Sequence, residues 1–178
     1  MREGAPRSSW ITRPAIALCL VLLSILVTSL VSAATQLSGL PAPDFVLKSL
    51  SGENLRLSEY SGQVVIVTFW ATWCGDCRAQ LSEFDALHDS YQDDDFELLA
   101  VSLDQNWSEL KKTATELDLS YPTLHDADLV VSKLYDVNSM PVSVLIDRDG
   151  FVREVVEDHR RARGQSMSDR VGELLGDW

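Results

Sequence analysis

The chain of 178 residues carries 27 Asp and Glu against 15 Lys and Arg, a formal net charge of −12 at pH 7. This acidic balance argues against nucleic acid as a partner and against docking on an anionic lipid surface. Hydrophobic residues make up 46% of the chain, which is enough for a domain with a substantial core. Length and composition therefore predict one folded domain with room for a targeting segment.

The N-terminal region contains an uncharged apolar run at residues 15–34, which follows Arg2, Arg7 and Arg13. A basic start, an apolar stretch and small residues at its end are typical of an export signal. About 20 apolar residues can also span a bilayer, so an uncleaved anchor is an equal alternative. Residues 1–34 are therefore predicted to be a signal peptide or transmembrane anchor. The rest is expected in the periplasm or another extracytoplasmic space, attached to the inner membrane if residues 15–34 are retained.

The first half of the remaining chain shows four segments of distinct pattern. Residues 35–43 are small, polar and proline-bearing, which favours a linker before a domain at 44–178. Two short apolar runs flank residues 51–54 and predict a β-hairpin. A continuous β-branched run at 63–70 is typical of a strand buried on both faces. From there the apolar period changes to that of a helix.

The second half continues the alternation of strands and helices. The predicted elements are a helix at 77–91, a strand at 93–103, a helix at 107–119, a short helix around 127–135, strands at 142–147 and 151–156, and a final helix. Ser166 and Asp169 fit a capping box at the start of that last helix. This order predicts an α/β fold with a mixed central sheet flanked by helices and extended by an N-terminal hairpin.

Two of the three cysteines, Cys74 and Cys77, stand in the motif FWATWCGDC directly after the buried strand. A structural disulfide, half of a metal site and a redox pair are the alternatives. Zinc needs four nitrogen or sulfur ligands, and the sequence has neither a second C-x-x-C nor histidines at ligand spacing. Haem attachment requires His where Arg78 stands. A disulfide closing so short a loop would restrain the unfolded chain little.

The position of the pair favours redox chemistry. At a strand-to-helix junction Cys74 meets unpaired backbone N–H groups and the positive end of the helix dipole. Such surroundings stabilise the thiolate over the thiol and lower the pKa of the first cysteine. The predicted catalytic residues are therefore Cys74 and Cys77, and no metal or other cofactor is expected beyond their reversible disulfide.

Three segments, APDF (42–45), FWATWCGDC (69–77) and MPVSVLIDRDG (140–150), resemble the TlpA/ResA-type group of thioredoxin-like thiol–disulfide oxidoreductases. The resemblance implies a thioredoxin fold in a protein that is exported or membrane-tethered. It implies disulfide-bearing protein substrates, apocytochrome c among them, and a membrane or periplasmic thiol electron donor. It also implies that Pro141 is cis beside the disulfide and that the backbone of Met140 binds the substrate. We expect a monomer.

Several positions around the motif are expected to tune the pair or to form the wall of the site. They are Thr68, Trp73, Gly75, Asp76 and Gln80. Thioredoxins carry a buried acid where Thr68 stands, and ResA-like proteins carry a glutamate where Gln80 stands; both acids are thought to move the proton of the second thiol. Neither acid is present here. Asp76 instead puts a carboxylate between the cysteines, either opposing the Cys74 thiolate or capping the helix.

Two other classes of function remain open at this point. Redoxin-type peroxidases share the fold and an APDF-like entry, although they usually carry Pro and then Thr or Ser shortly before a single peroxidatic cysteine. Here Ala71, Thr72 and Trp73 precede Cys74. A thioredoxin-shaped binding module without turnover would tolerate the loss of either cysteine.

Overall fold

The computed structural model describes residues 37–91, 94–157 and 166–176. The predicted signal or anchor segment, residues 1–34, lies outside this part of the chain. No helix within the described ranges is both long enough and apolar enough to cross a membrane.

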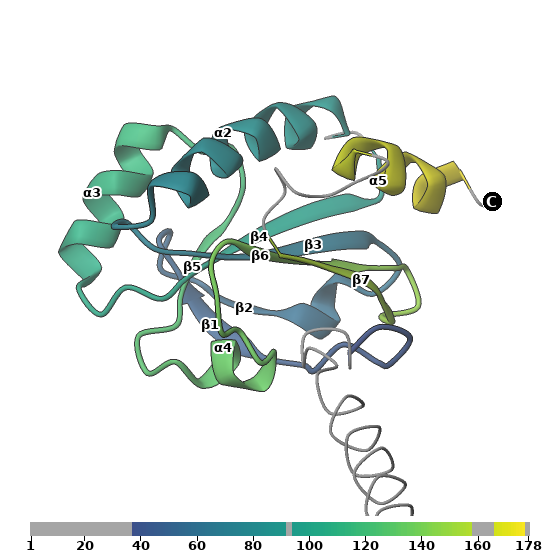
Figure 1. The fold of residues 1–178 in the computed structure, drawn as a ribbon, viewed down its shortest axis with the longest axis horizontal. Coiled ribbons are helices and arrows are strands. Elements are labelled where there is room, and N and C mark those ends of the chain that lie inside the picture. Colours follow the sequence, from purple (N-terminus) through teal and green to yellow (C-terminus); the bar gives the residue numbers. More distant parts are fainter. Residues whose placement is uncertain (1–36, 92–93, 158–165, 177–178) are drawn as a thin grey trace, which may run out of the picture. The chain divides into compact units, whose positions relative to one another are not determined.

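Within the described residues, seven strands form one mixed sheet in the order β2-β1-β5-β4-β3-β6-β7 (Figure 1). The strands are β1 (Val46–Ser49), β2 (Asn54–Arg56), β3 (Val64–Trp70), β4 (Phe96–Ser102), β5 (Thr123–His125), β6 (Val142–Ile146) and β7 (Val152–Glu157). β3, β4 and β5 run parallel, and the remaining pairs are antiparallel. The predicted mixed sheet is confirmed, with β3 and β4 at its centre.

Helices cover both faces of this sheet. α2 (Gly75–Ser90), α3 (Trp107–Leu117) and α5 (Met167–Gly176) lie on one face, and α4 (Val130–Leu134) lies on the other (Figure 1). All seven residues of β3 are buried because helices or loops cover it from both sides. The core therefore consists of two apolar clusters, one on each face of the sheet.

Strand alternation decides which side chains meet α2. Val64, Ile66 and Trp70 of β3 belong to the cluster that contains the buried residues of α2. Thr68 has the same parity in β3, so its side chain lies on the α2 face as well. Ser143 of β6 pairs with Thr68 across the ladder and shares that face. Two hydroxyls are thus placed under the helix that follows the cysteine motif.

The observed elements differ from the predicted ones in three places. β5 and the short 3₁₀ helix η2 (Leu57–Tyr60) were not predicted, because three or four residues are too few to show a period. Part of the expected linker belongs to the domain: the N–H of Gly39 bonds Val152, that of Ala42 bonds Gly150, and residue 41 bridges residue 151. This segment pairs with the start of β7, which a proline-rich composition does not reveal.

The C-terminal helix begins as the sequence predicts. The Ser166 N–H donates to the Asp169 carboxylate at 3.0 Å, and the Asp169 N–H donates to the Ser166 hydroxyl at 3.2 Å. This reciprocal pair confirms the capping box.

Tyr135 ties the N-terminal segment to the face of the sheet that carries α4. Its ring is 1% exposed and its hydroxyl donates to the Pro43 carbonyl at 2.8 Å. Burial, with the nearby charge of Asp44 as a lesser cause, raises the pKa of Tyr135 above its usual value, so the donor proton is retained. We expect Tyr135→Phe to lower the free energy of unfolding by about 1 kcal/mol. Urea denaturation measures this change.

A matched control is Tyr91→Phe, because the Tyr91 hydroxyl makes only a long, exposed bond of 3.4 Å to Ser168. Its loss should cost less than about 0.5 kcal/mol. Equal losses in the two variants would contradict the anchoring role of Tyr135.

Candidate active site

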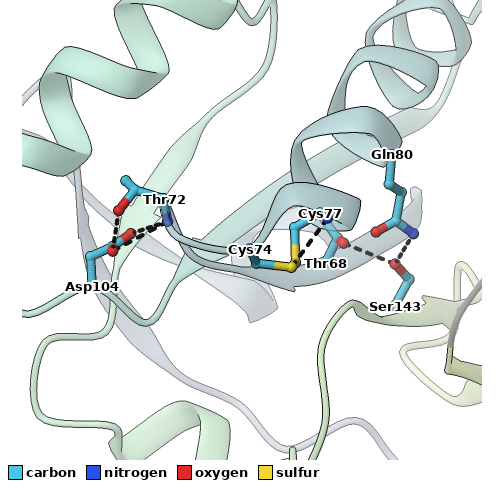
Figure 2. Close-up of a disulfide and its surroundings, with 7 residues drawn as sticks. All are labelled: Thr68, Thr72, Cys74, Cys77, Gln80, Asp104 and Ser143. Atoms are coloured by element: carbon cyan, nitrogen blue, oxygen red, sulfur yellow. Dashed lines mark hydrogen bonds between the residues drawn. A yellow bond between two sulfur atoms is a disulfide. The ribbon is translucent and has the colours of Figure 1, made fainter.

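The cysteine motif lies where β3 ends at Trp70 and α2 begins at Gly75. Cys74 is the N-cap residue of α2, and its Sγ accepts a hydrogen bond from the Cys77 N–H at 3.2 Å. Cys74 and Cys77 form a disulfide with their Cα atoms 5.3 Å apart (Figure 2). The first cysteine therefore sits at the helix terminus, where backbone donors and the dipole stabilise negative charge.

The two sulfurs differ in their access to solvent. Cys77 is 0% exposed and belongs to the core cluster under α2, whereas Cys74 is only partly buried. Trp73, directly before Cys74, is 72% exposed. Gly75 and Asp76 are also exposed, in the first turn of α2. A reaction partner can therefore reach Cys74 across an open rim, while Cys77 is shielded.

The Met140–Pro141 peptide bond is cis, which confirms the predicted conformation. Pro141 is buried immediately before β6. Met140 and Cys74 are both partly buried and pack against the core cluster that contains Cys77. The structure thus brings the sequence-predicted segments around residues 74 and 140 to the same cluster.

Thr68 and Gln80, the two positions without the expected acids, are linked by a residue that the sequence did not single out. The Gln80 amide nitrogen donates to the Ser143 hydroxyl at 3.3 Å, and that hydroxyl donates to Thr68 Oγ1 at 2.9 Å (Figure 2). Thr68 and Ser143 are 0% exposed and Gln80 is 5% exposed. A buried chain of neutral hydrogen-bonding groups therefore stands at the positions where the resemblance led us to look for carboxylates.

A second missed residue, Asp104, holds the loop before Cys74 within the motif. Its carboxylate, in a side chain buried to 4% exposure, accepts from the Thr72 N–H at 2.9 Å, the Thr72 hydroxyl at 2.7 Å and the Ser102 hydroxyl at 2.8 Å (Figure 2). Asp104 follows β4, which is parallel to β3, so the carboxyl ends of both strands meet at one edge of the sheet. This topology is the signal by which Asp104 could have been found.

The site contains what dithiol–disulfide exchange needs: one accessible sulfur at a helix N-terminus and a second, shielded sulfur within bonding distance of it. Among the described residues, no group of three His, Cys, Asp or Glu side chains is placed to hold a metal ion. Fold and site together define a thiol–disulfide oxidoreductase with a thioredoxin-like fold.

Comparison with known proteins agrees with this class. Residues 38–155 match the AhpC/TSA family, and the chain belongs to that family. It is 35% identical over 118 residues to the thiol-disulfide oxidoreductase ResA of Geobacillus kaustophilus, covering 66% of this chain and 68% of that one. It is 34% identical over 140 residues to ResA of Oceanobacillus iheyensis, covering 76% and 70% respectively. The protein is therefore a thiol–disulfide oxidoreductase of the ResA type.

Solved structures lead to the same fold. A Chlorobium tepidum structure described as a thiol:disulfide interchange protein DsbE superposes with a TM-score of 0.72 at 32% identity, covering 76% of this chain and 96% of that one. A Bacteroides thetaiotaomicron structure described as a protein disulfide isomerase gives a TM-score of 0.68 at 27% identity, covering 79% and 91%. The thioredoxin-like fold expected from the sequence is thus confirmed.

Proposed function

We propose that the protein reduces disulfides of other proteins outside the cytoplasm, with Cys74 as nucleophile and Cys77 as resolving thiol. The observation that carries this proposal is the unequal access of the two sulfurs, Cys74 being partly exposed and Cys77 fully buried. A buried second thiol cannot start the reaction with a bulky protein, but it can end it by attacking Cys74 from within.

The reaction balances over two exchanges. The Cys74 thiolate attacks one sulfur of a client disulfide, forms a mixed disulfide and releases the other client sulfur, which takes up a proton. The Cys77 thiol then loses its proton and attacks Cys74 Sγ, forming the intramolecular disulfide and expelling the second client sulfur as a thiolate. The client gains two electrons, and a dithiol donor must return two electrons to the Cys74–Cys77 disulfide.

Client binding is proposed for the surface around the exposed sulfur. The Trp73 ring offers an open apolar face beside Cys74, and Met140 presents its backbone just before the cis bond to Pro141. An extended client segment could add backbone hydrogen bonds there. Apocytochrome c and other exported proteins are the proposed clients, and a membrane or periplasmic thiol protein is the proposed electron donor. We propose that the protein is a monomer and needs no metal or organic cofactor. Residues 15–34 either belong to a signal peptide that is cleaved off or anchor the protein in the membrane.

A comparison of the rates with three separate substrates tests this function. Reduced protein is mixed with an oxidised Cys-x-x-Cys-His peptide, with insulin, or with hydrogen peroxide, and thiol consumption is followed. We expect the two disulfide substrates to be reduced much faster than peroxide. Faster turnover of peroxide would favour the peroxidase class that shares this fold, and no turnover of any substrate would favour a binding module.

Asp76 is expected to tune the nucleophile. It is an exposed acid in the first turn of α2, two residues after Cys74. A negative charge there opposes the thiolate, so Asp76→Asn should lower the Cys74 pKa by up to about one unit, roughly 1.4 kcal/mol. Stabilising the thiolate stabilises the reduced protein, so the variant should also be more oxidising, by up to about 30 mV. Thiolate absorbance against pH and equilibration with glutathione measure the two quantities.

The control is Asp89→Asn, which removes an exposed acid at the other end of the same helix. It should leave both quantities unchanged, since charges separated by more than a Debye length are screened. An unchanged Cys74 pKa with slower resolution of the mixed disulfide would instead assign Asp76 to proton transfer from Cys77. No change in either would leave it as a helix cap.

A further inference from the structure

One buried polar atom beside the redox pair has no partner in the disulfide form. Gln80 is 5% exposed, and its amide nitrogen donates a hydrogen bond to the Ser143 hydroxyl. Its carbonyl oxygen Oε1 has no hydrogen-bond partner among the described residues. Leaving a buried carbonyl unpaired is unfavourable, by an amount comparable to a lost hydrogen bond. A polar group in this situation indicates either strain or a partner that is present in another state of the protein.

The position of this carbonyl points to Cys77. Both residues belong to the buried face of α2, three positions apart, so their side chains are neighbours on the helix surface. In Figure 2 the Gln80 nitrogen faces Ser143, and the oxygen is turned toward the side where Thr68 and Cys77 lie. Solvent does not compete for this space, since Cys77 is 0% exposed.

The ability of Cys77 to donate a hydrogen bond to this carbonyl depends on its redox state. In the disulfide, Cys77 Sγ has no hydrogen to donate. Two-electron reduction breaks the S–S bond, and the buried sulfur takes up a proton and becomes an S–H donor. Reduction therefore creates a donor one helical turn from an acceptor that otherwise has none.

We infer that Gln80 accepts a hydrogen bond from the Cys77 thiol in the reduced protein and thereby stabilises the reduced form over the disulfide. The inference rests on the proposed dithiol function and assigns Gln80 a role in setting its equilibrium. Because an amide cannot take the proton away, Gln80 holds Cys77 as a thiol rather than deprotonating it. The Gln80 nitrogen already donates to Ser143, so the oxygen is the amide atom that is left to accept from the sulfur.

The first test is the redox equilibrium of Gln80→Met with glutathione. Methionine has a similar length and no acceptor of comparable strength, and the Ser143 hydroxyl still donates to Thr68 after the substitution. The disulfide form loses an unpaired carbonyl and the reduced form loses a hydrogen bond, so both effects favour the disulfide. We expect the equilibrium constant for reduction to fall about tenfold, which corresponds to about 30 mV toward more reducing potential.

The matched control is Ser143→Ala. It removes the partner of the Gln80 nitrogen but leaves the Gln80 carbonyl, and that loss is the same in both redox forms. The equilibrium constant should therefore change by less than about threefold, under 15 mV at 29.6 mV per tenfold. An equal shift in Ser143→Ala and Gln80→Met, or none in Gln80→Met, would overturn the inference.

A spectroscopic test observes the bond itself. In full-length protein carrying Cys19→Ser and Cys74→Ala, the remaining thiol is Cys77, and its S–H stretching band in the infrared shifts to lower frequency when hydrogen-bonded. Adding Gln80→Met should move the band to higher frequency, and adding Ser143→Ala should leave it closer to its original place. An unmoved band in Gln80→Met contradicts the bond whether or not the enzyme is active. A wild type that reduces no protein disulfide but shows the band shift would refute only the proposed function.

Discussion

Cys74→Ser is expected to abolish disulfide reduction, bringing the rate of dithiothreitol-driven insulin reduction down to that of dithiothreitol alone. The physical reason is access: the partly exposed Cys74 sulfur can meet a protein disulfide, and the fully buried Cys77 sulfur cannot replace it. A serine hydroxyl is not ionised near neutral pH and has no comparable nucleophilicity toward sulfur. Turbidity of precipitating insulin chains provides the measurement.

The companion variant Cys77→Ser should behave differently. Its Cys74 still attacks client disulfides, but no second thiol of the same chain can cleave the mixed disulfide that results. Mixed disulfides should therefore accumulate and appear as reducible adducts in mass spectra. In the reduced wild type, iodoacetamide should label Cys74 far faster than Cys77. Equal labelling of the two thiols in the folded protein would reverse or remove these assignments.

Asp104→Ala should be among the most destabilising substitutions near the site, lowering the free energy of unfolding of the disulfide form by about 3 kcal/mol. The substitution leaves three buried or partly buried donors, two from Thr72 and one from Ser102, without their acceptor. It also removes the hydrogen bonds that hold the loop at Thr72, two residues before Cys74. Because displacing a reacting group by about 1 Å can cost 100-fold in rate, we expect client reduction to slow by at least about tenfold. Urea denaturation and insulin reduction below the unfolding transition measure the two effects.

Asp126→Ala separates positioning from stability. Asp126 is also buried, at 2% exposure, and its carboxylate accepts from three backbone N–H groups at the start of α4, on the other face of the sheet. It should destabilise the protein to a similar degree and leave the reduction rate nearly unchanged. A double-mutant cycle of Asp104→Ala with Thr72→Val should show coupling above about 0.5 kcal/mol. Additive losses, or equal rate effects for the two aspartates, would refute a positioning role for Asp104.

The sequence predicted those parts of the site that depend on neighbouring residues. A buried strand followed at once by two cysteines and a helical period placed Cys74 at a helix start, and resemblance to a known group placed a cis-proline at 141. The contacts made by Ser143 and Asp104 could not be read in the same way, because their partners lie 63 and 75 residues away for Ser143 and 32 residues away for Asp104. Such pairs depend on strand order and register. The three-residue strand β5, which lies between β1 and β4, was too short to predict, so the full strand order was not available from the sequence.

The N-cap of α2 is a sulfur atom, where helices more often use a hydroxyl or carboxylate oxygen. On reduction, the same sulfur can become an anion and a stronger acceptor for the Cys77 N–H. The strength of this helix cap and the redox state of the cysteine pair are therefore linked in one thermodynamic cycle. The difference in unfolding free energy between the oxidised and reduced proteins must equal the difference between the redox free energies of the unfolded and folded pair. Comparing denaturation curves of the two forms thus reports how far the folded chain displaces the equilibrium of an unconstrained C-x-x-C peptide.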